Sequence, residues 1–211
     1  MTRIDLNPTA QCSEKLGGMI FHGMEEIIGH SGVVAVLNFA RLPGLLDHFN
    51  QRDFPVALAY SELGKIQAAL EKLYGSRGGR GIALRSGRSC FNYSLREYGK
   101  ELGLLSLSYR LMTASAKISA GLSLVIGHLS DLFATPIELS EQADHYSITI
   151  QNCPVCYQRK VNVEVCHLIV GFLQEFLYWI SGGKFYNVHE TSCAAAGTNA
   201  CVIQIDKQAF E

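Results

Sequence analysis

The first half of the chain carries hydrophobic residues at helical spacing. A first helix is predicted by one apolar face that follows the candidate cap Ser13 and stops at Gly29, with the members Leu16, Met19, Ile20, Met24 and Ile27. A second apolar segment spans 33–39 and ends at Leu42-Pro43-Gly44, and an amphipathic helix then begins at Ser61 and ends at Gly75. We expect residues 75–81, rich in glycine and arginine, to form a loop, with helices following over 84–98 and 109–133.

The hydrophobic period changes to two after Pro136. Tyr146, Ile148 and Ile150 alternate with polar residues, which predicts a half-buried strand, and residues 137–139 suggest a shorter partner. A helical pattern over 166–180 ends at Gly182-Gly183, and two more alternating segments follow at 186–189 and 202–205. The order β-β-α-β-β predicts an α+β fold, in which a helical N-terminal half precedes a four-stranded antiparallel sheet packed on helices. We expect a helical region over 1–103 and an α+β domain over 104–211, joined as one compact unit.

Composition narrows the class of protein. Of 211 residues, 48% are hydrophobic and 18% are charged, which favours a folded chain with a sizeable core. The net charge is -1 and no basic stripe is present, so we expect no nucleic-acid partner. No segment has the pattern of a signal peptide or the length of a membrane span, and the seven cysteines are an odd number, so we expect reduced thiols and a cytoplasmic location.

The last predicted hairpin carries candidate metal ligands. If Val188 faces the core then Glu190 does too, and Cys201 shares the parity of Ile203. Cys193 lies just past the strand end, and Cys166 lies at the start of the preceding helix. Thiolates and a carboxylate are zinc ligands, and four of them with no open position describe a structural site. The spacing is not a standard zinc spacing, so four ordinary half-buried side chains remain the alternative on spacing alone.

The run Glu-x-x-Cys-x-x-x-Gly-x-x-x-Cys, placed after an apolar helix that ends in Gly-Gly, resembles the 4-vinyl reductase domain. The resemblance covers about residues 104–205. It implies zinc bound by Cys166, Glu190, Cys193 and Cys201, as in phenol-sensing bacterial regulators, and a fold related to a subunit type of vesicle-tethering complexes. The stretch 74–88 is similar to members from photosynthetic organisms, which include proteins linked to photosystem assembly and chlorophyll handling and a bacteriochlorophyll-biosynthesis protein.

The resemblance and the apolar helices together suggest a non-catalytic binding protein. We expect it to carry a small hydrophobic ligand, with chlorophyll or a related tetrapyrrole as the leading candidate, on apolar residues of two helices and two arginines: Leu122, Ile126, Leu129, Phe172, Phe176, Trp179, Arg85 and Arg88. For Arg85 and Arg88 a solvated helix face is the simpler interpretation. The alternatives are a sensor of small hydrophobic molecules, or a protein-interaction module that forms a homodimer and binds photosystem assembly proteins, in either case peripheral to a photosynthetic membrane. A vinyl reductase is disfavoured because no redox-cofactor motif is visible.

Two other pairs of residues are candidate ligands. Cys153 and Cys156 form a CxxC pair that is able to replace Glu190 or Cys166 as metal ligands. His128 and His145 are candidate axial ligands of a tetrapyrrole, although an isolated histidine is more often simply hydrogen-bonded.

Overall fold

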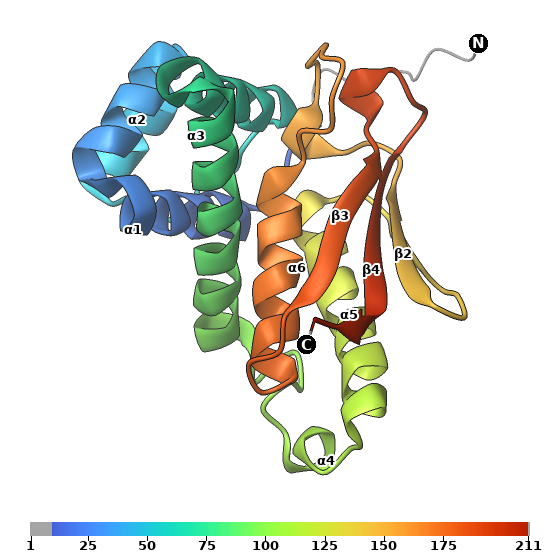
Figure 1. The fold of residues 1–211 in the computed structure, drawn as a ribbon. Coiled ribbons are helices and arrows are strands. Elements are labelled where there is room, and N and C mark those ends of the chain that lie inside the picture. Colours follow the sequence, from blue (N-terminus) through green and yellow to red (C-terminus); the bar gives the residue numbers. More distant parts are fainter. Residues whose placement is uncertain (1–9, 211) are drawn as a thin grey trace.

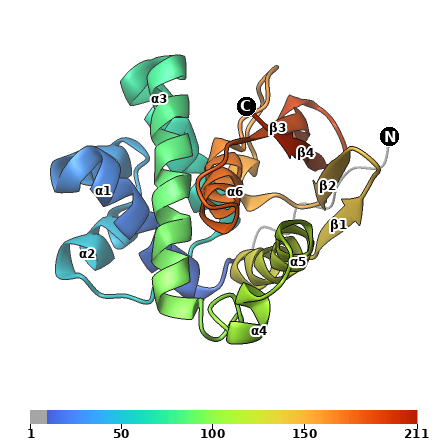
Figure 2. The same cartoon turned by 60° about the horizontal axis from the view of Figure 1, so that its bottom comes forward.

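The computed structural model describes residues 10–210, and its elements form successive layers. Helix α3 packs between α1 and α6, α6 packs on β3, and α5 packs on β1, so helices cover one face of the sheet (Figure 1 and Figure 2). The helices are α1 Glu14–Phe39, α2 Pro43–Gln51, α3 Tyr60–Tyr98, α4 Leu107–Arg110, α5 Ala114–Phe133 and α6 His167–Ile180; the strands are β1 Ile137–Glu141, β2 His145–Ile150, β3 Tyr186–Ser192 and β4 Cys201–Ala209; the short 3-10 helices are η1 Pro154–Cys156 and η2 Ala194–Ala196.

The four strands form one antiparallel sheet in the order β1-β2-β4-β3. Ile148 of β2 pairs with Leu139 on one side and with Ile203 on the other. Both β2 and β4 alternate buried and half-buried residues, because one face packs on the helices. The prediction of an α+β fold with a helical first half is therefore confirmed.

Glycines kink two long helices and explain one wrong prediction. Gly29 in α1 and Gly75 in α3 have φ values of 70° and 74°, which only glycine adopts without strain. Residues 75–81 were expected to form a loop, but only Gly75 leaves the helical conformation and helix resumes directly after it. Gly79 lies against the backbone of Glu71 across the kink, so a side chain at position 79 would keep the two arms of α3 apart.

Two short helices were not predicted. Pro43, expected to end a segment, instead occupies the first turn of α2, where its missing N–H has no cost. The long helix expected from residue 109 is divided into α4 and α5, because Thr113 caps α5 by accepting a hydrogen bond from the Ala116 N–H.

Close contact between α3 and α6 fixes the position of the start of α6. A methyl group on Gly87 would overlap the Leu168 carbonyl of α6, and one on Gly171 would overlap the Leu84 carbonyl of α3. The two backbones therefore meet without intervening side chains. This contact holds Cys166, the N-cap residue of α6, at one end of the sheet.

Candidate metal centre

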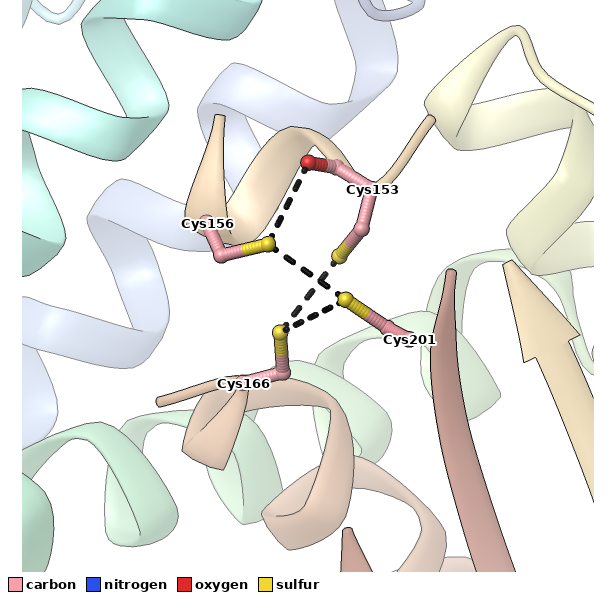
Figure 3. A group of neighbouring side chains, drawn as sticks. All are labelled: Cys153, Cys156, Cys166 and Cys201. Atoms are coloured by element: carbon pink, nitrogen blue, oxygen red, sulfur yellow. Dashed lines mark hydrogen bonds between the residues drawn. The ribbon is translucent and has the colours of Figure 1, made fainter. Parts of the chain in front are cut away.

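Five of the seven cysteines converge on one buried region at the end of the sheet. Their side chains are at most 3% exposed, and all five are free thiols: Cys153, Cys156, Cys166, Cys193 and Cys201. They come from the η1 segment after β2, the start of α6, the β3–β4 connection and the first residue of β4. Figure 3 draws four of them and shows sulfurs from three separate segments pointing toward one another.

The distances between these sulfurs suit a mononuclear tetrahedral site. The Sγ of Cys166 lies 3.5 Å from that of Cys153 and 3.6 Å from that of Cys201, and the Sγ of Cys156 lies 3.4 Å from that of Cys201. The Sγ of Cys193 lies 4.0 Å from those of both Cys166 and Cys201. Four sulfurs at about 2.3 Å from a zinc ion would stand about 3.8 Å apart. The observed spacing brackets that value.

Two sets of four ligand atoms are compact enough to hold a metal ion. Within each set all atoms lie within 4.8 Å of one another; the sets are Cys153, Cys156, Cys166 and Cys201, and Cys166, Glu190, Cys193 and Cys201. A buried cysteine cluster able to hold a metal ion is therefore present. The second set consists of the four residues expected from the sequence, and the first adds the CxxC pair.

Glu190 contributes a carboxylate that lacks a full set of partners. Its Oε2 accepts a hydrogen bond of 2.8 Å from the Cys166 N–H, whereas its Oε1 is buried with no partner among the described residues. Burial raises the pKa of this carboxyl group. A buried carboxylate is costly unless a cation or a hydrogen-bond donor compensates it, so this oxygen suits a metal ion.

The hairpin turns in a way that brings Cys193 back to the centre. The β3–β4 register shifts between Glu190 and Ser192, and after η2 the chain reverses at Gly197 with a φ of 99°. The Ala194 N–H lies 3.4 Å from the Cys201 Sγ and donates to it. A backbone donor at a sulfur stabilises its thiolate form, which is the form that binds metal.

The CxxC segment is fixed by contacts with distant parts of the chain. The buried guanidinium of Arg159 forms a 2.6 Å ion pair with Glu71 of α3. The Val161 N–H donates to the Ala195 carbonyl at 3.0 Å, which ties the segment to the hairpin. The sequence offered the CxxC pair only as a competing ligand source, because these long-range contacts have no local signature. The one available signal was that Ile150, three residues before Cys153, ends the strand that pairs with Cys201.

The residues expected to bind a small molecule are distributed over the core and surface. Five are buried among other side chains: Leu122, Ile126, Leu129, Phe172 and Phe176. Leu129 and Phe172 line an internal apolar cavity of about 10 Å³ between α1, α3, α5 and α6. Arg85 donates to the Gly81 carbonyl, and Arg88 donates to Gln174.

Trp179 lines a much larger pocket near α4. This pocket measures about 520 Å³, and its other lining residues are Leu104, Leu105, Tyr109, Arg110, Lys117 and Ile180. Its wall is apolar on the α6 side, and two cationic side chains reach it from the α4–α5 segment. The sequence pointed to Trp179 but not to Arg110 or Lys117, since neither stands in a recognisable motif.

The two candidate histidines both have a side-chain partner. His128 is buried, with its Nε2 at 2.8 Å from the Ser94 hydroxyl, and burial lowers the pKa of this imidazole. The Nδ1 of His145 lies 2.8 Å from the Asp144 carboxylate at the start of β2. Neither histidine lines the pocket that contains Trp179.

Comparison with known proteins supports the resemblance and shows the fold. Residues 146–207 match the family model of the 4-vinyl reductase domain. No curated protein matches the chain. The fold is similar to that of an Fe(II) unliganded H-NOX protein from K. algicida (TM-score 0.58, 10% identity, 92% of this chain and 96% of that chain) and of an H-NOX protein from S. oneidensis in the Fe(II)NO ligation state (TM-score 0.57, 13% identity, 92% and 99%).

A mutant H-NOX structure from T. tengcongensis is comparably similar, with a TM-score of 0.55, 14% identity, and coverage of 93% of this chain and 98% of that chain. At these identities the likeness concerns the fold. Along residues 10–210, no helix combines the length and the apolar character that a membrane crossing requires.

Proposed function

We propose that this protein is a non-catalytic binding protein, stabilised by a zinc ion, that carries a small hydrophobic molecule. The observation that carries the proposal is the convergence of buried sulfurs and the Glu190 carboxylate inside and beside the region matched by the 4-vinyl reductase domain. Zinc is proposed at Cys166, Glu190, Cys193 and Cys201. A site with four protein ligands leaves no position for substrate, so the role of the ion is structural.

The zinc proposal is supported by the donor chemistry of the site. Three thiols and one carboxylate are zinc ligands, and the unpartnered Glu190 Oε1 is compensated once a cation is bound. Bound zinc would hold the β3–β4 hairpin onto the start of α6. Because such a site is absent from the unfolded chain, its binding energy contributes to folding.

Elemental analysis of the purified protein tests the zinc proposal. We expect bound zinc in the wild-type chain and a strong loss of zinc in Cys193→Ala. Cys90→Ala is the matched control, because Cys90 is equally buried but its thiol donates to the Met19 carbonyl, away from the cluster. A wild-type protein that contains no metal after expression with added zinc would contradict the proposal.

For the small molecule, we propose an apolar ligand with an anionic group, with a chlorophyll-type tetrapyrrole as the leading candidate. The 520 Å³ pocket beside Trp179 lies within the range of about 300–1,000 Å³ that is typical of ligand pockets. Leu104, Leu105 and Ile180 suit an apolar body, while Arg110 and Lys117 suit a carboxylate. The adjoining core residues of α5 and α6 are proposed to rearrange around a larger ring. This pigment role would place the protein at the periphery of a photosynthetic membrane.

Absorbance titration with a chlorophyllide or a protoporphyrin tests the ligand proposal. We expect saturable binding by the wild-type chain and at least about tenfold weaker binding by Trp179→Ala, since a buried aromatic contact of this size is worth more than about 1.4 kcal/mol. Tyr178→Ala is the control, because Tyr178 neighbours Trp179 on α6 but does not line the pocket. Equal binding by the two variants would place the ligand elsewhere, and no binding by the wild type would exclude these pigments.

A second candidate is a protein-interaction module without a small-molecule ligand. It is favoured by apolar residues left exposed on the helical half, namely Phe39, Leu73 and Tyr74. In this function the helices before Gly103 form a homodimer and a docking face, and photosystem assembly proteins are the proposed partners. Light scattering tests it: a dimer that becomes a monomer in Leu73→Glu supports the module, and a monomeric wild-type chain contradicts it.

A further inference from the structure

The cysteine centre offers more ligands than one tetrahedral ion uses. Five thiols and one carboxylate meet there, and each four-membered set leaves two of the six unused. Zinc in the set with Glu190 leaves Cys153 and Cys156 as buried spare thiols. Zinc in the all-thiol set leaves the Glu190 Oε1 buried without a partner.

The two sets share one edge, the pair Cys166 and Cys201. The sulfurs of this pair lie 3.6 Å apart, and each has a near neighbour in both sets. Cys166 is 3.5 Å from Cys153 on one side and 4.0 Å from Cys193 on the other. Cys201 is 3.4 Å from Cys156 and 4.0 Å from Cys193 in the same way.

The unshared ligands come from two different segments. Cys153 and Cys156 belong to the η1 segment, while Glu190 and Cys193 belong to the β3–β4 hairpin. The two segments approach the shared pair separately, and each is anchored independently of a metal, η1 by the Arg159–Glu71 ion pair and the hairpin by its pairing with β4. This arrangement describes two tetrahedra with a common edge.

We propose that the centre holds two metal ions bridged by the thiolates of Cys166 and Cys201, with Cys153 and Cys156 completing one tetrahedron and Glu190 and Cys193 the other. The inference rests on the proposed function, in which the centre binds zinc. A thiolate is able to bridge two ions because its sulfur has more than one lone pair. All six ligands are then used, and the buried Glu190 carboxylate is compensated.

The second ion does not increase the charge buried at the centre. Binding at Cys153 and Cys156 releases one proton from each thiol, so the two positive charges of the ion replace two protons. No electrons are transferred, and zinc suits the site because it has no redox chemistry of its own. The Ala194 N–H that donates to Cys201 supports the thiolate form of one bridging sulfur.

Native mass spectrometry of the reduced, zinc-saturated full chain tests the inference. We expect two zinc ions per wild-type chain, and one in the double variant Cys153→Ser with Cys156→Ser. The matched control Cys90→Ser should retain two, because Cys90 lies outside the cluster. The variant Glu190→Gln with Cys193→Ser removes the other pair of unshared ligands and should also retain one, which covers the case in which the CxxC variant fails to fold.

The outcomes separate this inference from the proposed function. One zinc ion per wild-type chain overturns the two-ion centre and leaves the structural zinc site standing, whereas no zinc at all contradicts both. Cobalt(II) gives a second readout with the wild-type chain. The electron paramagnetic resonance signal should rise with the first equivalent and fall with the second, because bridging thiolates couple the two spins; a signal that simply doubles overturns the bridge.

Discussion

Cys201 is the residue on which the metal centre depends most. It belongs to both candidate ligand sets, it is fully buried, and it begins β4 opposite Ile150 of β2. The parity of the last strand predicted its inward orientation from the sequence, since Ile203 and Ile205 are buried on the same face. Cys166 is its counterpart, held at the start of α6 by the contact between α3 and α6.

Replacing Cys201 by serine should therefore remove all bound metal. We expect the free energy of unfolding to fall by well over the roughly 1 kcal/mol that is typical of a point substitution, because metal binding is lost together with the hairpin contact. Urea denaturation measures the change. Cys12→Ser is the control, since Cys12 is buried outside both sets; equal destabilisation by both variants would argue against a special role for Cys201.

His128 should make stability depend on pH. Burial lowers the pKa of its imidazole in the folded chain below the ordinary value of 6.5, so the unfolded chain binds the proton more tightly. This contribution is fully present above about pH 6.5 and is lost as the pH falls from there toward the folded pKa. Measured by denaturation at pH 7.5 and 5.5, the wild type should lose up to about 1.4 kcal/mol more than His128→Gln, which keeps a polar group beside Ser94. Parallel losses in the two proteins would show that His128 does not titrate in this way.

At the scale of elements, glycine does more than punctuate the chain. The sequence predicted helix ends at Gly29 and Gly75, and the structure has a kink at each position. The same reasoning failed for 75–81, where glycine serves close packing rather than loop formation. The packing role of Gly87 and Gly171 depends on how α3 crosses α6, and no local pattern in either helix reveals that crossing.

Gly171→Ala should destabilise the protein by separating α6 from α3. The added methyl group meets the Leu84 carbonyl, so the helices must move apart and Cys166 moves with them. We expect a loss of about 1–3 kcal/mol, as for other overpacked sites, together with weaker zinc retention. Gly127→Ala in α5 is the matched control: no atom lies within 4 Å of its new methyl group, and alanine favours helix. A stable Gly171→Ala protein with normal zinc content would contradict this description of the helix contact.

At the scale of the whole molecule, the metal centre connects segments that are far apart in the sequence. The η1 segment, α6 and the terminal hairpin meet there, while α1 and α2 pack on α3 away from it. The sequence predicted the order of the strands and helices because each has its own hydrophobic period. It did not predict that the CxxC pair joins the centre, because the approach of η1 depends on the Arg159–Glu71 pair across 88 positions of sequence.

Removing the metal should therefore loosen one end of the molecule more than the other. After treatment with a chelator, we expect faster amide hydrogen exchange in residues 153–166 and 188–201 than in α1 and α2. Mass spectrometry of peptic fragments measures this difference. Uniform acceleration along the chain would instead indicate global unfolding, and unchanged exchange near the cysteines would show that metal does not stabilise them.

The most direct measurement is X-ray absorption at the zinc edge on the intact protein. If the buried thiols bind the ion, the spectrum should show a dominant shell of sulfur neighbours at about 2.3 Å with a minor oxygen contribution from Glu190. A zinc ion surrounded by oxygen or nitrogen alone, or a chain that retains no zinc for the experiment, would contradict a metal centre built from Cys166, Cys193 and Cys201.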